Sequence, residues 1–178
     1  MNYNLHEKID EILKVREEYI DLEPISVLKN YKPNPPASEQ ELIKAENKLG
    51  FKINSQYKEF LKIMNGFDNF QYVTDLFGTT DFNGSEKYKA AIESLNLTKR
   101  IFEEEEIPLE INIEDALLIG ADENGNLVVI MKVGSNLEDK VFCIGNGGID
   151  NEYDDFYQYL NDQVEFFKEW CEIVKAEG

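Results

Sequence analysis

Three short polar side chains at alternating positions give the sequence its closest approach to a metal-binding motif. Asp122, Asn124 and Asn126 have the spacing of the first three ligands of a calcium-binding loop. The rest of that loop is missing, because Leu127 stands where the motif needs glycine and Val133 stands where it needs a bidentate acid. We interpret the segment as a hairpin turn, and we expect no metal and no cofactor.

The other residue types that carry catalysis have no supporting arrangement. Residues 145–148 are rich in glycine but lack the lysine and the Ser/Thr of a phosphate-binding loop. His6 is the only histidine, which gives a histidine-based triad poor support, and no spacing of carboxylates singles out an acid and base pair. Cys143 and Cys171 lack C-x-x-C spacing and are interpreted as small buried apolar residues. The sequence therefore predicts a protein that is not an enzyme.

The balance of charge restricts the classes of partner. The chain has 36 acidic residues against 18 basic residues, which gives a formal net charge of −18. Such a field repels nucleic acid phosphates and anionic membrane surfaces, and it attracts a basic protein. Acidity that serves only solubility is the other interpretation. We expect a protein partner and no direct contact with nucleic acid or membrane, and the sequence indicates no oligomeric state.

Length and composition predict one domain. The chain has 178 residues, of which 42% are hydrophobic, and this is enough for a single core. Its opening, MNYNLHEKID, is charged and polar, whereas a secretory signal has a basic start and an apolar run. No later segment approaches the length of a membrane span. A cytoplasmic protein is expected.

The segment after the prolines predicts two helices joined by a short connection. Ser38 and Glu41 have capping-box spacing and begin the first helix, which Gly50 ends. A second helix follows residues 51–54 and ends at Asn65-Gly66. Their apolar faces, at helical spacing, consist of Leu42, Ala45, Leu49, Tyr57, Phe60, Leu61 and Met64. Two helices joined by so few residues must pack as a compact corner.

The remaining pattern predicts an α+β fold with a mixed or antiparallel central sheet and helices from both termini packed against it. Residues 1–35 are expected to form an N-terminal helical extension and a proline-rich connector, and residues 36–178 the domain itself. The other expected elements are a strand at 72–77, a helix at 85–97, strands at 116–120, 127–133 and 140–144, and a C-terminal helix whose aromatic face is interpreted as core. The run 127–131 is continuously apolar, which predicts a central strand covered on both faces, on one side by helices. The acidic run 103–106 belongs in solvent, on a loop or at a helix end.

The order of residues in the helical corner resembles the N-terminal signature of the SUKH superfamily, which is also known for its Smi/Knr-like domains. The motif positions that match are Glu46, Leu49, Gly50, Phe51, Tyr57, Phe60, Leu61, Asn65 and Gly66. Residues 118–127 look like the central strand and turn of the family, and residues 153–167 partly resemble its closing helix. The chain departs from the pattern at Ile53-Asn54, where the family commonly has Leu-Pro, and it lacks the usual tryptophan of the helical region.

The resemblance implies a non-catalytic protein-binding domain, because the superfamily includes bacterial immunity proteins and fungal regulators of cell-wall synthesis. With the acidic charge, it suggests an immunity protein that neutralises a toxin such as a basic nuclease. The candidate partner-binding residues are Asp122, Glu123, Asp150, Glu152, Tyr153, Asp154, Asp155 and Tyr157. A regulatory scaffold of the fungal kind and a small-ligand-binding domain remain as alternatives.

Overall fold

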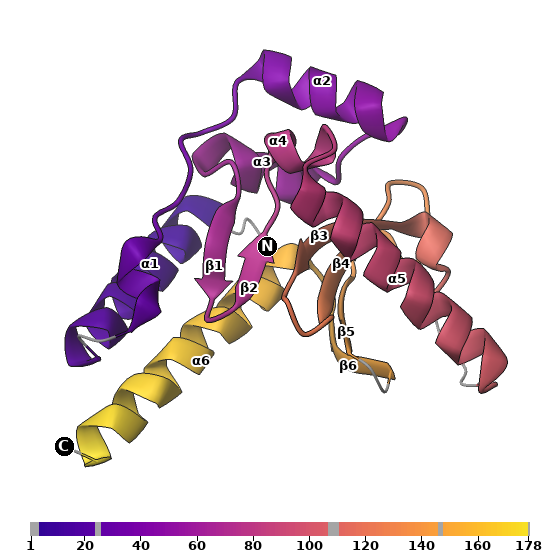
Figure 1. The fold of residues 1–178 in the computed structure, drawn as a ribbon. Helices are drawn as coiled ribbons and strands as arrows, with labels where there is room; N and C mark the ends of the chain where they lie inside the picture. The colour runs from indigo at the N-terminus through magenta and orange to yellow at the C-terminus, as the bar shows by residue number, and fades with distance from the viewer. Residues whose placement is uncertain (1–3, 24–25, 107–110, 146–147, 178) are drawn as a thin grey trace.

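The computed structural model describes residues 4–23, 26–106, 111–145 and 148–177 (Figure 1). Its α-helices are α1 (Leu5–Leu22), α2 (Glu39–Leu49), α3 (Ser55–Ile63), α4 (Thr79–Phe82), α5 (Glu86–Glu104) and α6 (Phe156–Glu177). Its strands are β1 (Phe67–Gln71), β2 (Thr74–Leu76), β3 (Ala116–Ala121), β4 (Leu127–Met131), β5 (Val141–Gly145) and β6 (Gly148–Tyr153). Short 3-10 segments lie at Val27–Asn30 and Ile113–Asp115.

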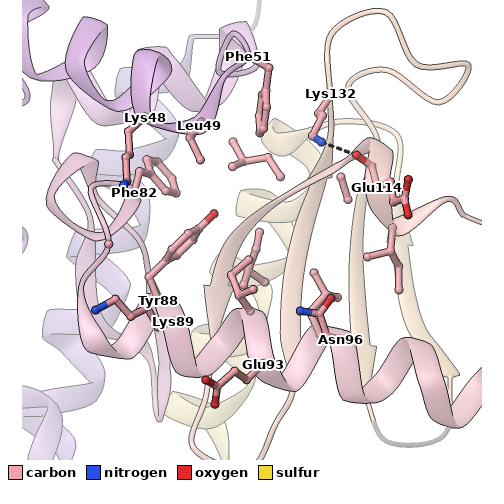
Figure 2. A pocket seen from close by; sticks show the side chains of 17 residues that line it. Lys48, Leu49, Phe51, Phe82, Tyr88, Lys89, Glu93, Asn96, Glu114 and Lys132 are labelled. Atoms are coloured by element: carbon pink, nitrogen blue, oxygen red, sulfur yellow. Dashed lines mark hydrogen bonds between the residues drawn. The ribbon is translucent and has the colours of Figure 1, made fainter.

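The six strands form one sheet in chain order, with every neighbouring pair antiparallel. This confirms the expected α+β class. Strands β3 and β4 are buried at every residue, as a central position requires. Helices lie on both faces of the sheet rather than on one, since α5 crosses one face and α6 lies behind the other (Figures 1 and 2). The full burial of β4 follows from that double cover.

The helical corner has the predicted local chemistry. The Ser38 hydroxyl accepts from the Glu41 amide and the Glu41 carboxylate accepts from the Ser38 amide, so the capping box at the start of α2 is complete. Gly50 ends α2 in the left-handed conformation, at φ +80°. The Asn54 side chain then caps α3 by accepting from the amides of Gln56 and Tyr57. The two caps fix where each helix begins.

Helix α1 packs along α6, and the two helices lie next to one another in Figure 1. The rings of Tyr19 and Phe167 meet with centroids 6.1 Å apart. Arg16 donates to the backbone oxygens of Leu28 and Asn69, at 3.0 and 3.3 Å, which ties α1 to the chain that follows it and to β1. The expectation that helices from both termini pack on the domain is confirmed, and the boundary at residue 35 stays a prediction.

The strand predicted at 72–77 is confirmed as β2, at Thr74–Leu76, but the strand that precedes it in the hairpin, β1, was missed. Strand β1 begins just after Gly66, and the chain reverses at Tyr72, which has φ +57°. Asn69 also has a positive φ, of +51°, at an irregularity in the pairing of β1 with β2. Polar residues within a short irregular strand interrupt the alternation by which a strand is recognised.

Strand β6 was missed for a related reason. Gly148–Tyr153 forms the outer edge of the sheet, and its three residues at 150–152 are exposed. A solvated edge strand lacks the apolar pattern that marks a buried one. The predicted glycine-rich turn overlaps β6 at its first residue, Gly148, and positions 146–147 lie outside the described residues. Helix α5 is longer than expected, so that the acidic run 103–106 begins inside its last turn, at a helix end.

Gly66 sits where only glycine fits. It has φ +86°, and an added Cβ would lie 2.6 Å from the backbone nitrogen of Gly78. Gly50 has a similar φ of +80° but has open space around it. We therefore expect Gly66→Ala to lower the free energy of unfolding by about 2 to 4 kcal/mol, since steric overpacking adds to left-handed backbone strain. The matched Gly50→Ala variant carries strain alone and should cost about 1 kcal/mol.

Urea denaturation of the two variants and the wild type measures this difference. Equal losses of stability in the two alanine variants would contradict the close approach of Gly66 to Gly78, the residue that precedes α4.

Candidate functional site

Glu46 is a buried carboxylate that holds the connection between α2 and α3. Its Oε1 accepts from the Ile53 amide at 3.3 Å and from the Lys58 ammonium at 3.1 Å, and its Oε2 accepts from the Lys52 ammonium at 2.8 Å. Burial alone raises the pKa of this carboxyl, but the hydrogen bonds from the two lysines outweigh burial and place the pKa below its usual value. Glu46 therefore remains charged and paired in the folded protein.

Tyr57 joins α3 to the sheet from inside the core. Its hydroxyl is fully buried, donates to the backbone oxygen of Phe77 at 2.6 Å and lies 3.1 Å from that of Ile119. Burial, followed by the charge of Asp81, raises its pKa, so the hydroxyl keeps its proton. The ring packs at its edge against Phe156, the first residue of α6, with centroids 5.1 Å apart. One side chain thus contacts the corner, the sheet and the C-terminal helix.

Asn65 fastens the end of the corner to the start of α4. Its Oδ1 accepts from the Thr79 amide at 2.7 Å, and its Nδ2 donates to the Thr79 hydroxyl at 2.8 Å. Of the remaining motif residues, Phe60 and Leu61 are fully buried, and Leu49 and Phe51 pack partly against the core. Most motif residues therefore act on the protein's own backbone and core, whereas Leu49 and Phe51 also line a groove.

The sheet register separates the predicted partner-binding residues into two groups. Asp122 and Glu123 lie in the β3–β4 turn, at the end of the sheet where Leu127 pairs with Ile144. Tyr153 lies at the other end, where it pairs with Val141. The first group consists of Asp122, Glu123 and Asp150, because Asp150 lies toward the Leu127 end of the sheet. The second group consists of Glu152, Tyr153, Asp154, Asp155 and Tyr157. Asp122 and Glu123 therefore lie at the opposite end of the sheet from Tyr153.

Asp122 holds its own turn. Its Oδ1 accepts from the amides of Asn124 and Asn126, at 2.8 and 2.9 Å, and its Oδ2 accepts from the side-chain amide of Asn126 at 2.7 Å. The calcium-like spacing is therefore used for backbone hydrogen bonds, as the hairpin interpretation requires. Glu123, the next residue, is exposed, and so is Asp150 on β6.

The carboxylates of the second group have partners within the protein. Lys140 forms an ion pair with Glu152 and lies 3.4 Å from the Asp154 carboxylate. The hydrogen bond with Glu152 is the main cause that raises the pKa of Lys140. Asp155 accepts from the Gln158 amide at 2.8 Å and so caps the start of α6. These contacts reduce the charge that the second group offers to a partner.

The two aromatic residues of the second group also have internal contacts. The Tyr153 hydroxyl donates to the Asp162 carboxylate at 2.7 Å, and burial, followed by this hydrogen bond, raises its pKa. The Tyr157 ring lies under the Lys8 ammonium, at 5.5 Å from its centroid, and the Tyr157 amide donates to Gln56. Both rings are half-buried against neighbouring elements.

A groove that the sequence did not indicate lies between α5, β3 and the end of α2. It has a volume of about 610 Å³. Figure 2 shows the rings of Phe51 and Tyr88 pointing into it, and Lys48, Lys89 and Lys132 around its margin. Burial, followed by the charge of Asp81, raises the pKa of Tyr88 to about 12. Its lining comes from several separate segments of chain, so no local spacing could have revealed it.

The described part of the chain has no arrangement of side chains suited to metal binding or to thiol chemistry. No cluster of three or more His, Cys, Asp or Glu residues is placed there to hold a metal ion. Burial, followed by the charges of Asp162 and Asp150, raises the pKa of the Cys143 thiol to about 12, which disfavours the reactive thiolate. Cys171 is buried against α1. None of the helices among the described residues is long and apolar enough to cross a membrane.

Fold and motif together define an α+β domain in which a helical corner docks on an antiparallel sheet. The model of the SMI1 / KNR4 family (SUKH-1) matches residues 36–169, and the chain belongs to this family. The resemblance drawn from the corner residues is thereby confirmed. Domains of this family generally bind proteins and are generally not catalytic, and membership fits both immunity roles and roles of the SMI1/KNR4 type. A search of curated proteins finds no match to the chain.

The lowered pKa of Glu46 predicts how acid acts on the corner. Its ordinary value is 4.5, so its ion pairs stabilise the fold fully above that pH and are lost as the pH falls through the lower folded value. We expect Glu46→Gln to lower the free energy of unfolding by about 1 to 3 kcal/mol at pH 7. The difference from wild type should shrink as the pH falls below about 4.5.

Urea titrations across this pH range provide the measurement. Glu59→Gln is the matched control, because Glu59 is exposed and, among the described residues, has an ion pair with Lys62 alone; it should change stability by less than about 1 kcal/mol. A loss in Glu46→Gln that stays constant from pH 7 to acid would show that the charge of Glu46 is not what holds the connection.

Proposed function

We propose that this protein is an immunity protein that binds a basic toxin, such as a nuclease, and neutralises it without catalysis. The observation that carries the proposal is the charge of −18 on a domain of the SMI1 / KNR4 family (SUKH-1). A field of this sign concentrates a cationic protein around the domain and speeds encounter. An enzyme that binds nucleic acid phosphates presents the opposite sign, which makes it a suitable partner.

Steric and electrostatic cover of an active site is the mechanism that this charge favours. A bound acidic domain excludes the phosphate backbone from the basic surface of a nuclease, because the two anions compete for the same cationic side chains. No group on the immunity protein has to react. Exposed carboxylates such as Glu123 and Asp150 have no ion pair among the described residues, so their charge is available to such a partner.

Affinity capture of the tagged protein from extracts of its source cells tests the proposal. We expect a near-stoichiometric basic protein at about 0.05 M salt that dissociates at about 0.5 M salt, where screening shortens the reach of surface charge. The captured protein, once purified, should kill cells or degrade nucleic acid in an activity assay. An equimolar amount of this domain should abolish that activity.

Two results would contradict the toxin proposal. The first is stable capture of host regulatory proteins alone, which supports the scaffold role known for the fungal members. The second is a captured toxin whose activity is unchanged at saturation, because binding without inhibition is not neutralisation.

The groove in Figure 2 favours a second candidate function, the binding of a small ligand. Its volume of about 610 Å³ and its aromatic lining are typical of ligand pockets, and its margin carries lysines together with the carboxylates of Glu93 and Glu114. A ligand present at about 100 times its dissociation constant should raise the free energy of unfolding by about 2.7 kcal/mol. Thermal-shift screening measures this effect, and Ile92→Trp, which fills the groove, should abolish it. Equal shifts in the variant and the wild type would rule out the groove.

A further inference from the structure

An apolar patch on the outer side of α6 remains only partly covered. We define the Trp170 patch as Phe166, Trp170 and Ile173 of α6 together with Tyr72 of the β1–β2 turn. Positions 166, 170 and 173 fall within about 60° of one another around a helix of 100° per residue. The ring of Trp170 lies 5.9 Å, centroid to centroid, from both Phe166 and Tyr72. Tyr72 is 43% exposed and Ile173 is 46% exposed.

A row of acidic side chains runs beside this patch. We define the carboxylate row as Asp162, Glu165, Glu169 and Glu172, whose spacing of three, four and three residues keeps them on one side of α6. Asp162 and Glu165 have polar partners in Tyr153 and Lys168. Glu169 and Glu172 are exposed and have no ion pair in the part of the chain that the structure describes. Half of the carboxylate row, Glu169 and Glu172, therefore keeps a charge that no ion pair among the described residues neutralises.

The lysines of α6 lie on a different side of the helix. Lys168 pairs with Glu11 at 3.2 Å and Lys175 pairs with Glu18 at 2.7 Å, so both reach toward α1. These pairs fasten the two terminal helices together. Helix α6 thus separates its charges, with cations toward α1 and free carboxylates beside the Trp170 patch. Packing against α1 accounts for the position of the lysines, but it does not require carboxylates beside the Trp170 patch.

The nature of the patch selects its occupant. Tryptophan and tyrosine carry a large share of the energy in protein interfaces when polar groups surround them. A second copy of this chain would bring Glu169 and Glu172 of both molecules together, on domains that already carry −18 each. A basic protein avoids this repulsion, and its arginine or lysine side chains can lie over the Trp170 ring while pairing with the row. Charge complementarity therefore favours a basic partner.

We propose that the Trp170 patch and the carboxylate row form the surface on which a basic protein partner docks. The inference deepens the proposed function and rests on it for the identity of that partner. The surface continues toward part of the region expected from the sequence, because Val73, next to Tyr72, lines a hollow together with Asp122 and Glu123. The second group, around Tyr153 to Tyr157, lies outside it.

The chain carries its own reporter, since Trp170 is its only tryptophan. The probe is a synthetic helical peptide with leucine on one face and lysine on the other, titrated into the full chain. We expect the emission of Trp170 to move to shorter wavelength as the peptide binds. Glu169→Lys combined with Glu172→Lys should weaken binding about tenfold, and Ile173→Ser should weaken it severalfold.

Matched controls lie on α5, whose end is remote from the end of α6 (Figure 1). Glu103→Lys combined with Glu104→Lys makes the same change in net charge at two exposed residues. Leu97→Ser removes an apolar side chain that is 48% exposed, against 46% for Ile173. Both controls should retain the affinity of wild type for the peptide.

Three results would overturn the proposal: unchanged Trp170 emission at saturation, equal losses in the α5 and α6 variants, or a dimer in sedimentation that Ile173→Ser converts to monomer. The experiments can reject the docking surface without rejecting the proposed function, and the reverse. A captured toxin that still binds the Glu169→Lys, Glu172→Lys variant rejects this surface and keeps the function. Peptide binding at the patch with no toxin captured keeps the surface and rejects the function.

Discussion

The side chains of Glu46 and Tyr57, which are buried, and of Asn65, which is half-buried, bond backbone groups where the helical corner meets the rest of the fold. Each side chain forms a hydrogen bond with a backbone group near the end of a helix or strand. Glu46 accepts from the Ile53 amide before α3, Tyr57 donates to the Phe77 carbonyl after β2, and Asn65 accepts from the Thr79 amide at the start of α4. An unpaired buried backbone group costs roughly as much as a lost hydrogen bond. The position of α5 across the sheet, and the groove beneath it, depend on these connections.

Most residues of the family motif bond or pack within the protein, so the motif does not by itself determine the outer surface. The motif fixes the corner, the corner fixes how α3 meets the first residue of α6, and the surface of α6 is then open to selection by a partner. Membership of the SMI1 / KNR4 family (SUKH-1) therefore specifies the fold and leaves the partner open. The charge of −18 and the aromatic patch on α6 are the features of this chain that we relate to its partner.

The parts of the fold that were predicted carry local signals, and the parts that were missed do not. The capping box at Ser38 and the left-handed end at Gly50 require only neighbouring residues, so the corner could be derived. Strands β1 and β6 are short, partly polar or at an edge, and their pairing depends on contacts distant in sequence. The aromatic face of α6 was interpreted as core, which holds for Phe167 but only partly for Trp170. Spacing places a side chain on a helix face, whereas its exposure depends on how far the neighbouring elements reach.

Hydrogen exchange of the protein alone and in complex with its captured partner tests the central claim most directly. If a basic protein docks on the Trp170 patch, exchange should slow in the second half of α6 and in the β1–β2 turn and stay unchanged at the end of α5. Slowing confined to the groove beside α5, or to the start of α6 around Tyr157, would contradict the account.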